Sequence, residues 1–292
     1  MTRETNRRKR LRPLLVFPLL LAGIFAGWIW WGNRSVQRTD FTIPTGLPIS
    51  EFRIAHISDL HNTEFGKENT ALLALLQEAA PALIAVTGDL VDSRHTDLDT
   101  AAAFMEAAAE IAPVYYVTGN HEARLESYPA LEKRLADAGV TVLRNQMAEL
   151  EWDGVRFCIA GIDDPDFSHT GGFLDESAAA ANAVLEEVLG KTRNAYTILL
   201  SHRPELLDVY AAQGVDLVLC GHAHGGQIRL PWIGGLYAPG QGFFPSYTSG
   251  LYSSGSTIMT VSRGLGNSLF PFRVNNRPEL ILLKLCESGF SR

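Results

Sequence analysis

The chain has 292 residues, of which 46% are hydrophobic and 20% charged, a composition typical of a folded protein with a core and not of a disordered or fibrous one. Its three cysteines are too few for a disulfide framework. The net charge of -7 is unevenly spread, because residues 1–38 carry a balance of +7 and leave -14 for the rest. A globular part this acidic lacks the basic surface that follows a phosphate backbone, which argues against nucleic acid as a partner.

The basic N-terminus (residues 1–12) precedes an uncharged segment. Residues 13–31 contain no charged side chain, and as a helix they would span roughly 28 Å, close to the hydrocarbon thickness of a bilayer. Basic residues cluster before this segment, so the positive-inside rule places residues 1–12 in the cytoplasm and the chain from about residue 32 outside it. We therefore expect a single-pass helix anchored in the cell membrane. A cleaved signal peptide is the alternative, and the tryptophans at 28, 30 and 31 argue against it.

The next elements follow an alternating pattern. Residues 32–51 are expected to form a linker, because Pro44, Gly46 and Pro48 interrupt any periodicity. From residue 52 onward short apolar runs alternate with helical ones, which predicts a mainly parallel sheet covered by helices. The expected strands are 52–57, 82–87, 114–118 and 140–143, and the expected helices are 68–80, 100–111 and 128–138.

The pattern changes in the second half of the chain. Asp153-Gly154 between two apolar runs, 147–152 and 155–159, predicts a hairpin. An α/β fold with two sheets face to face and helices outside, a four-layer α/β/β/α sandwich over residues 52–286 with a tail at 287–292, would accommodate this mixture. Further expected elements are helices 176–189 and 205–212, strands 195–200, 215–220, 257–262 and 279–285, and a long loop over 232–256.

Polar side chains follow five of the predicted strands at their carboxyl ends, where α/β sheets bind ligands. Separations of 30 residues from Asp59 to Asp89, and of 31 from Asp89 to Asn120, suit neighbouring parallel strands. Any one of these motifs alone could be turn or helix-cap chemistry, but five in order favour a common site. The candidates are Asp59, His61, Asp89, Asn120, His121, His202, His222 and His224.

The residue types in this set point to metal. Carboxylate, amide and imidazole donors without thiolate suit Mn, Fe or Zn better than a cysteine-type zinc site. Seven ligands from this set of eight are too many for one ion and fit two ions that share a carboxylate. Two ions roughly 3.5–4 Å apart can clamp the attacking and leaving oxygens of a phosphoryl displacement.

At these residues the sequence resembles the calcineurin-like metallophosphoesterases over about residues 52–286. It looks most like the membrane-anchored bacterial phosphodiesterase branch, which includes enzymes similar to UDP-2,3-diacylglucosamine pyrophosphatase of lipid A synthesis. The motifs that suggest this are His-Ile-Ser-Asp59-Leu-His61, Gly221-His222-Ala-His224-Gly-Gly-Gln227, Ser262-Arg263-Gly264-Leu-Gly266 and Arg-Pro278-Glu279.

The resemblance implies a role for each matching residue. Asp59, His61 and His224 would hold a first ion, Asn120, His202 and His222 a second, and Asp89 would bridge both. His121 would protonate the leaving oxygen or stabilise the developing charge, and a bridging hydroxide would attack. Mn is the expected metal, with Fe or Zn as alternatives. Asp92 stands where many relatives carry His or Asn, and would instead orient a ligand.

Other candidates are less specific. Asp163 and Asp164 begin a loop that could reach the metals or the substrate, or could form a turn. Arg263 could pair with a substrate phosphate or tie down the C-terminal loop. The apolar residues of 232–244 could line a lipid or sugar, although covering of the core is the more common role of such residues. Asp164 and Arg263 are the expected substrate-binding residues.

The sequence therefore predicts a membrane-anchored, dinuclear-metal phosphoesterase with an extracytoplasmic domain. Its expected substrate is a phosphodiester or a lipid-linked pyrophosphate such as UDP-2,3-diacylglucosamine. A phosphomonoesterase or protein phosphatase is the first alternative, but it would need a basic pocket for a dianion. A non-catalytic envelope-binding protein is the second alternative, and missing ligands would have favoured it.

Overall fold

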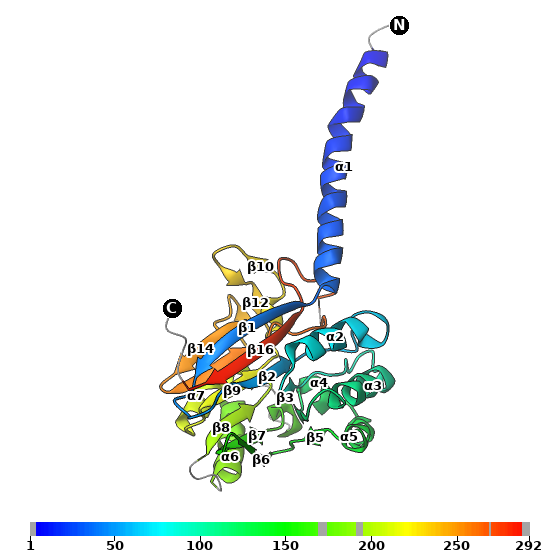
Figure 1. Ribbon diagram of the computed structural model, residues 1–292. Helices are drawn as coiled ribbons and strands as arrows, with labels where there is room; N and C mark the ends of the chain where they lie inside the picture. The colour runs from blue at the N-terminus through cyan, green and yellow to red at the C-terminus, as the bar shows by residue number, and fades with distance from the viewer. Residues whose placement is uncertain (1–3, 169–173, 191–194, 269, 288–292) are drawn as a thin grey trace.

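Two six-stranded sheets pack face to face in the computed structural model, which describes residues 4–168, 174–190, 195–268 and 270–287, the side chains of 4–16 excepted (Figure 1). The first sheet runs β1-β16-β2-β3-β4-β5, and only the β16–β2 pair is antiparallel. Its strands are β1 (Gln37–Pro44), β2 (Phe52–Ile57), β3 (Leu83–Thr87), β4 (Val114–Val117), β5 (Thr141–Val142) and β16 (Glu279–Cys286).

The second sheet runs β14-β15-β9-β8-β7-β6, with antiparallel pairs at its two edges and parallel pairs between them. Asp153 and Gly154 form the turn between its β6 and β7, as their sequence predicts. The strands are β6 (Gln146–Trp152), β7 (Val155–Gly161), β8 (Tyr196–Leu200), β9 (Leu217–Cys220), β14 (Gly250–Ser254) and β15 (Thr257–Val261).

Helices cover the outer face of each sheet, so the predicted four-layer order is confirmed. Between the sheets lies a buried apolar layer with side chains from both, such as Ile54 and Val117 opposite Phe157 and Leu219. Against the first sheet pack α2 (Thr70–Ala79), α3 (Leu98–Ala109) and α5 (Tyr128–Asp137), and against the second α6 (Leu174–Leu189) and α7 (Leu207–Ala212).

Several short helices and hairpins lie between the main strands and helices. The α4 helix (Asn120–Ala123) follows β4, and four 3-10 turns are η1 (Lys67–Asn69), η2 (Pro165–Ser168), η3 (Pro204–Leu206) and η4 (His224–Gly226). Two small hairpins are formed by β10 (Arg229–Leu230) with β11 (Gly234–Gly235), and by β12 (Tyr237–Ala238) with β13 (Gly242–Phe243).

The structure corrects two expectations about loops. The segment expected to be a linker, 32–51, contains β1, an edge strand parallel to β16. β1 lies at the edge of the sheet and has one neighbouring strand, so many of its side chains are exposed and polar. Its sequence therefore alternates only weakly between apolar and polar residues. The expected long loop 232–256 contains β11 to β14, and β14 joins the second sheet by pairing with β15.

The N-terminal helix α1 (Glu4–Arg34) projects away from the sandwich, and only its last turns contact the rest of the chain (Figure 1). Over the residues that the structure describes, no helix combines the length and apolar character needed to cross a membrane. Residues 13–16 of the expected anchor have no described side chains. Residues 1–3 of the basic N-terminus and 288–292 of the tail lie outside the described residues.

Candidate metal centre

The seven expected ligands all lie at the carboxyl ends of strands, four from the first sheet and three from the second, and each is buried. Turns after β2 and β3 carry the first three, and α4 begins with the fourth. The remaining three are histidines that follow β8 and β9. In order, the ligands are Asp59, His61, Asp89, Asn120, His202, His222 and His224.

A first group of ligand atoms comes from Asp59, His61, Asp89 and His224, all within 4.8 Å of one another. His224 Nε2 lies 3.3 Å from Asp59 Oδ1, and His61 Nε2 lies 3.5 Å from Asp89 Oδ2. Two carboxylates and two imidazoles in one buried cluster are the donor set of a divalent ion. These are the residues expected to hold the first ion, with Asp89 as bridge.

A second group is formed by Asp89, His202 and His222. His202 Nε2 lies 3.2 Å from Asp89 Oδ2 and 3.2 Å from His222 Nδ1. The same oxygen of Asp89 therefore faces imidazoles of both groups, which is consistent with a carboxylate that would be shared by two ions. The other oxygen, Asp89 Oδ1, accepts a hydrogen bond from the His121 backbone N–H at 2.8 Å.

Unpaired buried atoms support a metal at this position. Among the described residues, His61 Nε2 and Asn120 Oδ1 are buried and have no hydrogen-bond partner. Leaving such groups unpaired costs on the order of 1–3 kcal/mol each, so they usually have a partner that the protein atoms alone do not supply. Two divalent ions would supply it, and the residues present therefore fit a dinuclear centre.

The backbone at the site adopts conformations that are unusual for residues with side chains. Five ligands have positive φ, namely Asp59 (53°), His61 (45°), Asp89 (50°), His222 (66°) and His224 (46°). Such left-handed residues cost free energy and persist only where the surrounding fold fixes them, commonly at functional sites. A Cβ on Gly119 or Gly221 would overlap the carboxylates of Asp89 and Asp59, so glycine is required there.

Burial and charge set the protonation of the ligands. Burial lowers the pKa of His61 and of His224 to about 3, and lowers that of His222 as well. Neutral imidazole is the form that binds metal. Burial also acts to lower the pKa of His202, but the Asp89 carboxylate outweighs it and raises that pKa to about 10. A metal ion would replace the proton between these two groups.

His121 lies beside the ligands with a defined orientation. Its Nδ1 accepts a hydrogen bond from the Ser93 backbone N–H at 3.0 Å. Because a backbone N–H can only donate, Nδ1 of the neutral ring is the acceptor and Nε2 carries the proton. Nε2 lies 3.5 Å from Ser268 Oγ at the edge of the cavity described below. The ring is thus held with its Nε2–H at a position from which it could donate a hydrogen bond to a leaving oxygen.

Glu122 ends the Gly119-Asn120-His121-Glu122 motif, and the sequence alone predicted no role for it. Its buried carboxylate accepts hydrogen bonds from the backbone N–H groups of Gly119 (2.7 Å), Asp89 (2.8 Å) and Val91 (3.2 Å). Burial, with the Asp89 charge, raises its pKa to about 7. It ties the loop after β3 to the start of α4. Its position three residues after Gly119, that of a helix-capping acid, was the available signal.

A cavity of about 740 Å³ opens over the ligands. Three arginines line it, and each is paired with a carboxylate: Arg94 with Asp92 at 2.6 Å, Arg124 with Asp166 at 2.7 Å, and Arg203 with Asp164 at 2.6 Å. Other lining residues are Asp89, Ser93, Asn120, His121, Ala123, Asp166, His222, His224, Pro239, Gly240 and Ser268.

The two expected substrate-binding residues lie elsewhere. Asp164 is buried, does not line the cavity, and binds Arg203 through both carboxylate oxygens, at 2.6 and 2.8 Å. It thereby positions Arg203, whose Nη1 lies 3.2 Å from His222 Nε2. Arg263 donates to Glu279 at 2.7 Å, and this ion pair, like the backbone bond from the same arginine, ties the C-terminal loop to β16. The geometry supports the loop-tying alternative for Arg263.

Two further acidic candidates do not contact the ligands. Asp92 binds Arg94, and its Oδ2 lies 4.0 Å from His61 Nδ1, too far for a hydrogen bond, so the structure does not bear out direct orientation of that ligand. Asp163 binds Arg144 at 2.6 Å and does not reach the ligands.

The apolar residues of the 232–244 loop divide into two sets. Trp232, Ile233, Phe243 and Phe244 each have over half of their surface exposed and do not cover the core. Leu236 and Tyr237 are half-buried, and Ala238 is buried in the cluster outside the second sheet.

Comparisons with known proteins agree with this geometry. The family model for calcineurin-like phosphoesterases matches residues 52–226. YkuE of Bacillus subtilis, an uncharacterised metallophosphoesterase, is 31% identical, and the alignment covers 97% of this chain and 98% of YkuE. Phosphodiesterase YaeI of Escherichia coli is 30% identical over 80% of this chain and 82% of YaeI. The crystal structure of TT1561 of Thermus thermophilus shares the fold, with a TM-score of 0.51 at 16% identity, over 74% of this chain and 91% of that one.

Proposed function

Because the chain belongs to the calcineurin-like phosphoesterase family, we propose that it hydrolyses phosphodiester or pyrophosphate bonds in a substrate at the cell membrane. Metal-dependent phosphoester hydrolysis, at a centre for two divalent ions, follows from the family and from the two ligand groups. The preference for a diester or pyrophosphate, and the membrane, are the finer parts of the proposal.

The charge of the cavity carries the preference for a diester. A phosphodiester bears one negative charge, whereas a terminal phosphate bears close to two at pH 7 and calls for additional cations. The three arginines that line the cavity in the described part of the chain are already paired with aspartates. Two divalent ions alone would balance a singly charged diester, and among these described lining residues no arginine is left uncommitted for a dianion. This observation disfavours the phosphomonoesterase alternative.

The ligand residues divide into two sets around Asp89. Asp59, His61 and His224 would hold one ion, and Asn120, His202 and His222 the other. Divalent ions bound there would supply positive charge for the phosphoryl oxygens and lower the pKa of a water molecule. We propose Mn as the native metal, with Fe or Zn as the alternatives, because all donors are oxygen or imidazole nitrogen.

His121 is the proposed hydrogen-bond donor to the leaving oxygen. The Ser93 N–H fixes its Nδ1 as an acceptor, which leaves the proton on Nε2 at the cavity edge. A hydrogen bond from this N–H would stabilise the negative charge that develops on the oxygen as its bond to phosphorus breaks. Complete transfer of the proton would need the imidazolium ring, in which Nδ1 is a donor and cannot accept the Ser93 N–H.

The membrane part of the proposal rests on the N-terminal region. Residues 1–38 carry a balance of +7 around the uncharged stretch 13–31, and α1 exposes large apolar side chains to its surroundings. We place the protein in the cell membrane by this single helix, with the catalytic domain outside the cytoplasm. A C-terminal alkaline phosphatase fusion should then be active and a cytoplasmic reporter inactive; the reverse result would refute this orientation.

The substrate class is tested by comparing the turnover of a diester, a monoester and a lipid-linked pyrophosphate. Purified full-length protein, stripped of metal and resupplied with Mn, is given bis-p-nitrophenyl phosphate, p-nitrophenyl phosphate and UDP-2,3-diacylglucosamine, with Asp89→Ala as control. We expect metal-dependent turnover of the diester to exceed that of the monoester at least tenfold. Fast turnover of the lipid nucleotide would support a role in lipid A synthesis. Preference for the monoester would overturn the proposal.

A further inference from the structure

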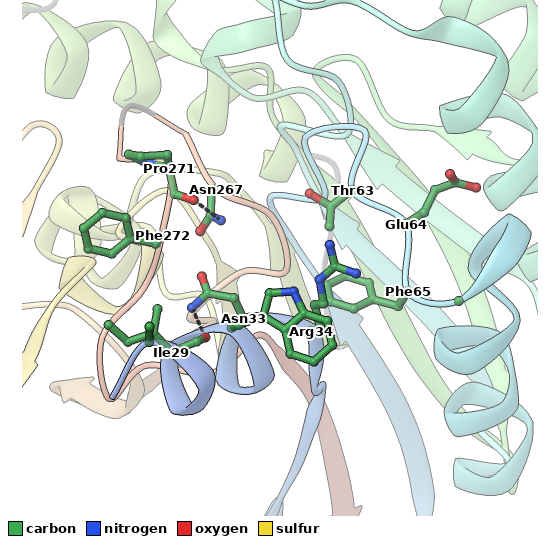
Figure 2. A pocket seen from close by; sticks show the side chains of 12 residues that line it. Ile29, Asn33, Arg34, Thr63, Glu64, Phe65, Asn267, Pro271 and Phe272 are labelled. Carbon is green, nitrogen blue, oxygen red and sulfur yellow. Dashed lines mark hydrogen bonds between the residues drawn. The ribbon is translucent and has the colours of Figure 1, made fainter. Parts of the chain in front are cut away.

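A second cavity lies at the base of α1, outside the metal centre. Its volume is about 630 Å³, within the roughly 300–1,000 Å³ usual for ligand pockets. It lies between the last turns of α1, the loop 63–66, and the residues Asn267, Pro271 and Phe272 (Figure 2). Its apolar lining comes mainly from Ala26, Ile29, Trp30, Phe65, Pro271 and Phe272.

The helix α1, which forms one wall of this cavity, exposes apolar side chains on all of its sides. Leu19, Leu20 and Leu21 are consecutive and therefore point to different sides of α1, yet each has at least half of its surface exposed. A helix that is apolar all round is normally covered by protein or by lipid. The described chain does not cover these side chains, and the lining residues Ala26, Ile29 and Trp30 place the cavity at the end of the helix nearest the sandwich.

A cation stands at the cavity without a carboxylate partner. Arg34 lines it and stacks over the Trp30 ring, 4.9 Å from the ring centroid. Among the described residues it forms no ion pair, unlike the three arginines of the metal cavity. Glu64 also lines the cavity, but its side chain points away from Arg34 and its Oε1 accepts the Glu68 backbone N–H (Figure 2). An unpaired guanidinium beside apolar walls suits a phosphate attached to a hydrocarbon chain.

The walls are held by hydrogen bonds that are partly or fully buried. Asn33 of α1 and Arg273 bond reciprocally: Asn33 Nδ2 donates to the Arg273 carbonyl at 2.9 Å, and the Arg273 N–H donates to Asn33 Oδ1 at 2.7 Å. The buried Arg273 guanidinium donates to the carbonyls of Arg263 and Gly266 and to Asn267 Oδ1. The cavity is therefore preformed, which lowers the entropy cost of binding.

Exposed aromatic residues surround this end of the molecule. Phe270 and Phe272 are 43% and 44% exposed on the loop beside the cavity. The hairpins of β10 and β12 lie at the end of the sandwich from which α1 projects (Figure 1), and Trp232 at the β10–β11 turn is fully exposed. Aromatic side chains in this arrangement are typical of surfaces that rest in the headgroup layer of a bilayer.

We propose that the cavity at the base of α1 binds an anionic phospholipid, with its phosphate on Arg34 and one acyl chain between Ile29, Phe65 and Phe272. This lipid is not the substrate, because it binds outside the metal centre. It would seat the domain on the bilayer at a fixed height. Binding at this site requires neither hydrolysis nor a membrane-spanning α1, so it can fail while the proposed function holds, and the reverse.

The test is native mass spectrometry of the full-length protein in a neutral detergent. The protein is titrated with dioctanoylphosphatidylglycerol, dioctanoylphosphatidylcholine or inorganic phosphate. We expect one phosphatidylglycerol per chain, bound at least about tenfold more tightly than either other probe. Equal binding of the two lipids, or binding of phosphate alone, would overturn the proposal, as would no binding.

Variants locate the site. Arg34→Gln should weaken phosphatidylglycerol binding about tenfold, and Phe272→Ser should weaken both lipids. The matched control is Arg38→Gln, which removes an exposed arginine already paired with Asp40. Hydrolysis of a soluble diester should be unchanged in all three, which verifies folding. A loss of lipid binding in Arg38→Gln equal to that in Arg34→Gln would indicate non-specific charge attraction and refute the site.

Discussion

The two sheets contribute different chemistry to a single metal centre. The expected oxygen ligands, Asp59, Asp89 and Asn120, all follow strands of the first sheet, whereas the expected ligands from the second sheet are imidazoles. Each ion would nevertheless draw ligands from both sheets, since His224 joins the first group and His202 the second. The centre is therefore complete only when the two sheets are packed together, and metal binding should stabilise that packing.

The largest effect is expected where the two ligand groups share an atom. Asp89→Asn weakens the bridge to both ions, so we expect less than one tightly bound ion per chain and a loss of hydrolysis of roughly a thousandfold or more, about 4 kcal/mol. Metal content by plasma mass spectrometry and diester turnover measure this. The control is Asp99→Asn, whose carboxylate is exposed. Two retained ions would show that Asp89 does not bridge.

Removing an imidazole of the second sheet should be more selective. His202→Ala takes a ligand from one group and leaves Asp59, His61 and His224 intact. We expect one ion to remain tightly bound, the other to dissociate, and the rate to fall roughly a hundredfold to a thousandfold. A metal titration resolves the two sites, with exposed His95→Ala as control. Loss of both ions together would mean that the sheets do not hold separable sites.

His121 should affect the reaction without affecting the metal. His121→Gln is expected to retain two ions and to slow hydrolysis about a hundredfold, because it removes the Nε2–H that stabilises the leaving oxygen. The loss should be greater for an alkyl leaving group, which carries a more concentrated charge, than for p-nitrophenolate, whose charge is delocalised. Turnover of the two diesters at equal metal content makes the comparison. An equal loss for both would contradict the proposed stabilisation of the leaving oxygen.

Glu122 should act through the first sheet's loops. Glu122→Gln replaces an oxygen that accepts backbone N–H groups with an amide N–H₂, which opposes them. We expect the free energy of unfolding of the metal-free protein to fall by about 1–3 kcal/mol, and the rate to fall about tenfold. Urea denaturation measures the first, with exposed Glu126→Gln as control. Unchanged stability would show that the three hydrogen bonds are dispensable.

The smallest effect on activity is expected for Arg263. Its side chain binds Glu279, so Arg263→Gln should lower the free energy of unfolding by about 1–3 kcal/mol and leave KM for a diester within about twofold. Diester kinetics and thermal denaturation measure the two effects. A large rise in KM with unchanged stability would restore this arginine to the substrate site.

The metal ligands could be predicted because their signal is local. Each stands next to an apolar strand, and parallel strands bring their carboxyl ends to one edge, so position along the chain implied position in space. The same reasoning predicted the hairpin at Asp153-Gly154 and the helices on both faces. The same reasoning missed strands whose hydrophobic periodicity is weak, such as the edge strand β1 and the late strand β14.

The sequence could not predict which charged residues form ion pairs with each other. Arg203 and Asp164 are 39 positions apart and Arg263 and Glu279 are 16 apart, and nothing in spacing shows that they pair. Glu122 was missed for the same reason, since its carboxylate reaches N–H groups on a different loop. Ion pairs of this kind depend on side-chain geometry, which packing sets.

The sequence by itself determined where the candidate ligands cluster, the layered fold and the uncharged N-terminal segment, because all three follow from residue type and short-range periodicity. Only the tertiary structure decided which arginines have a carboxylate partner. Among the described residues, the arginines over the metal cavity form ion pairs and Arg34 forms none. The physical reason is that a charge acts through its nearest partners, and these come from segments that only folding brings together.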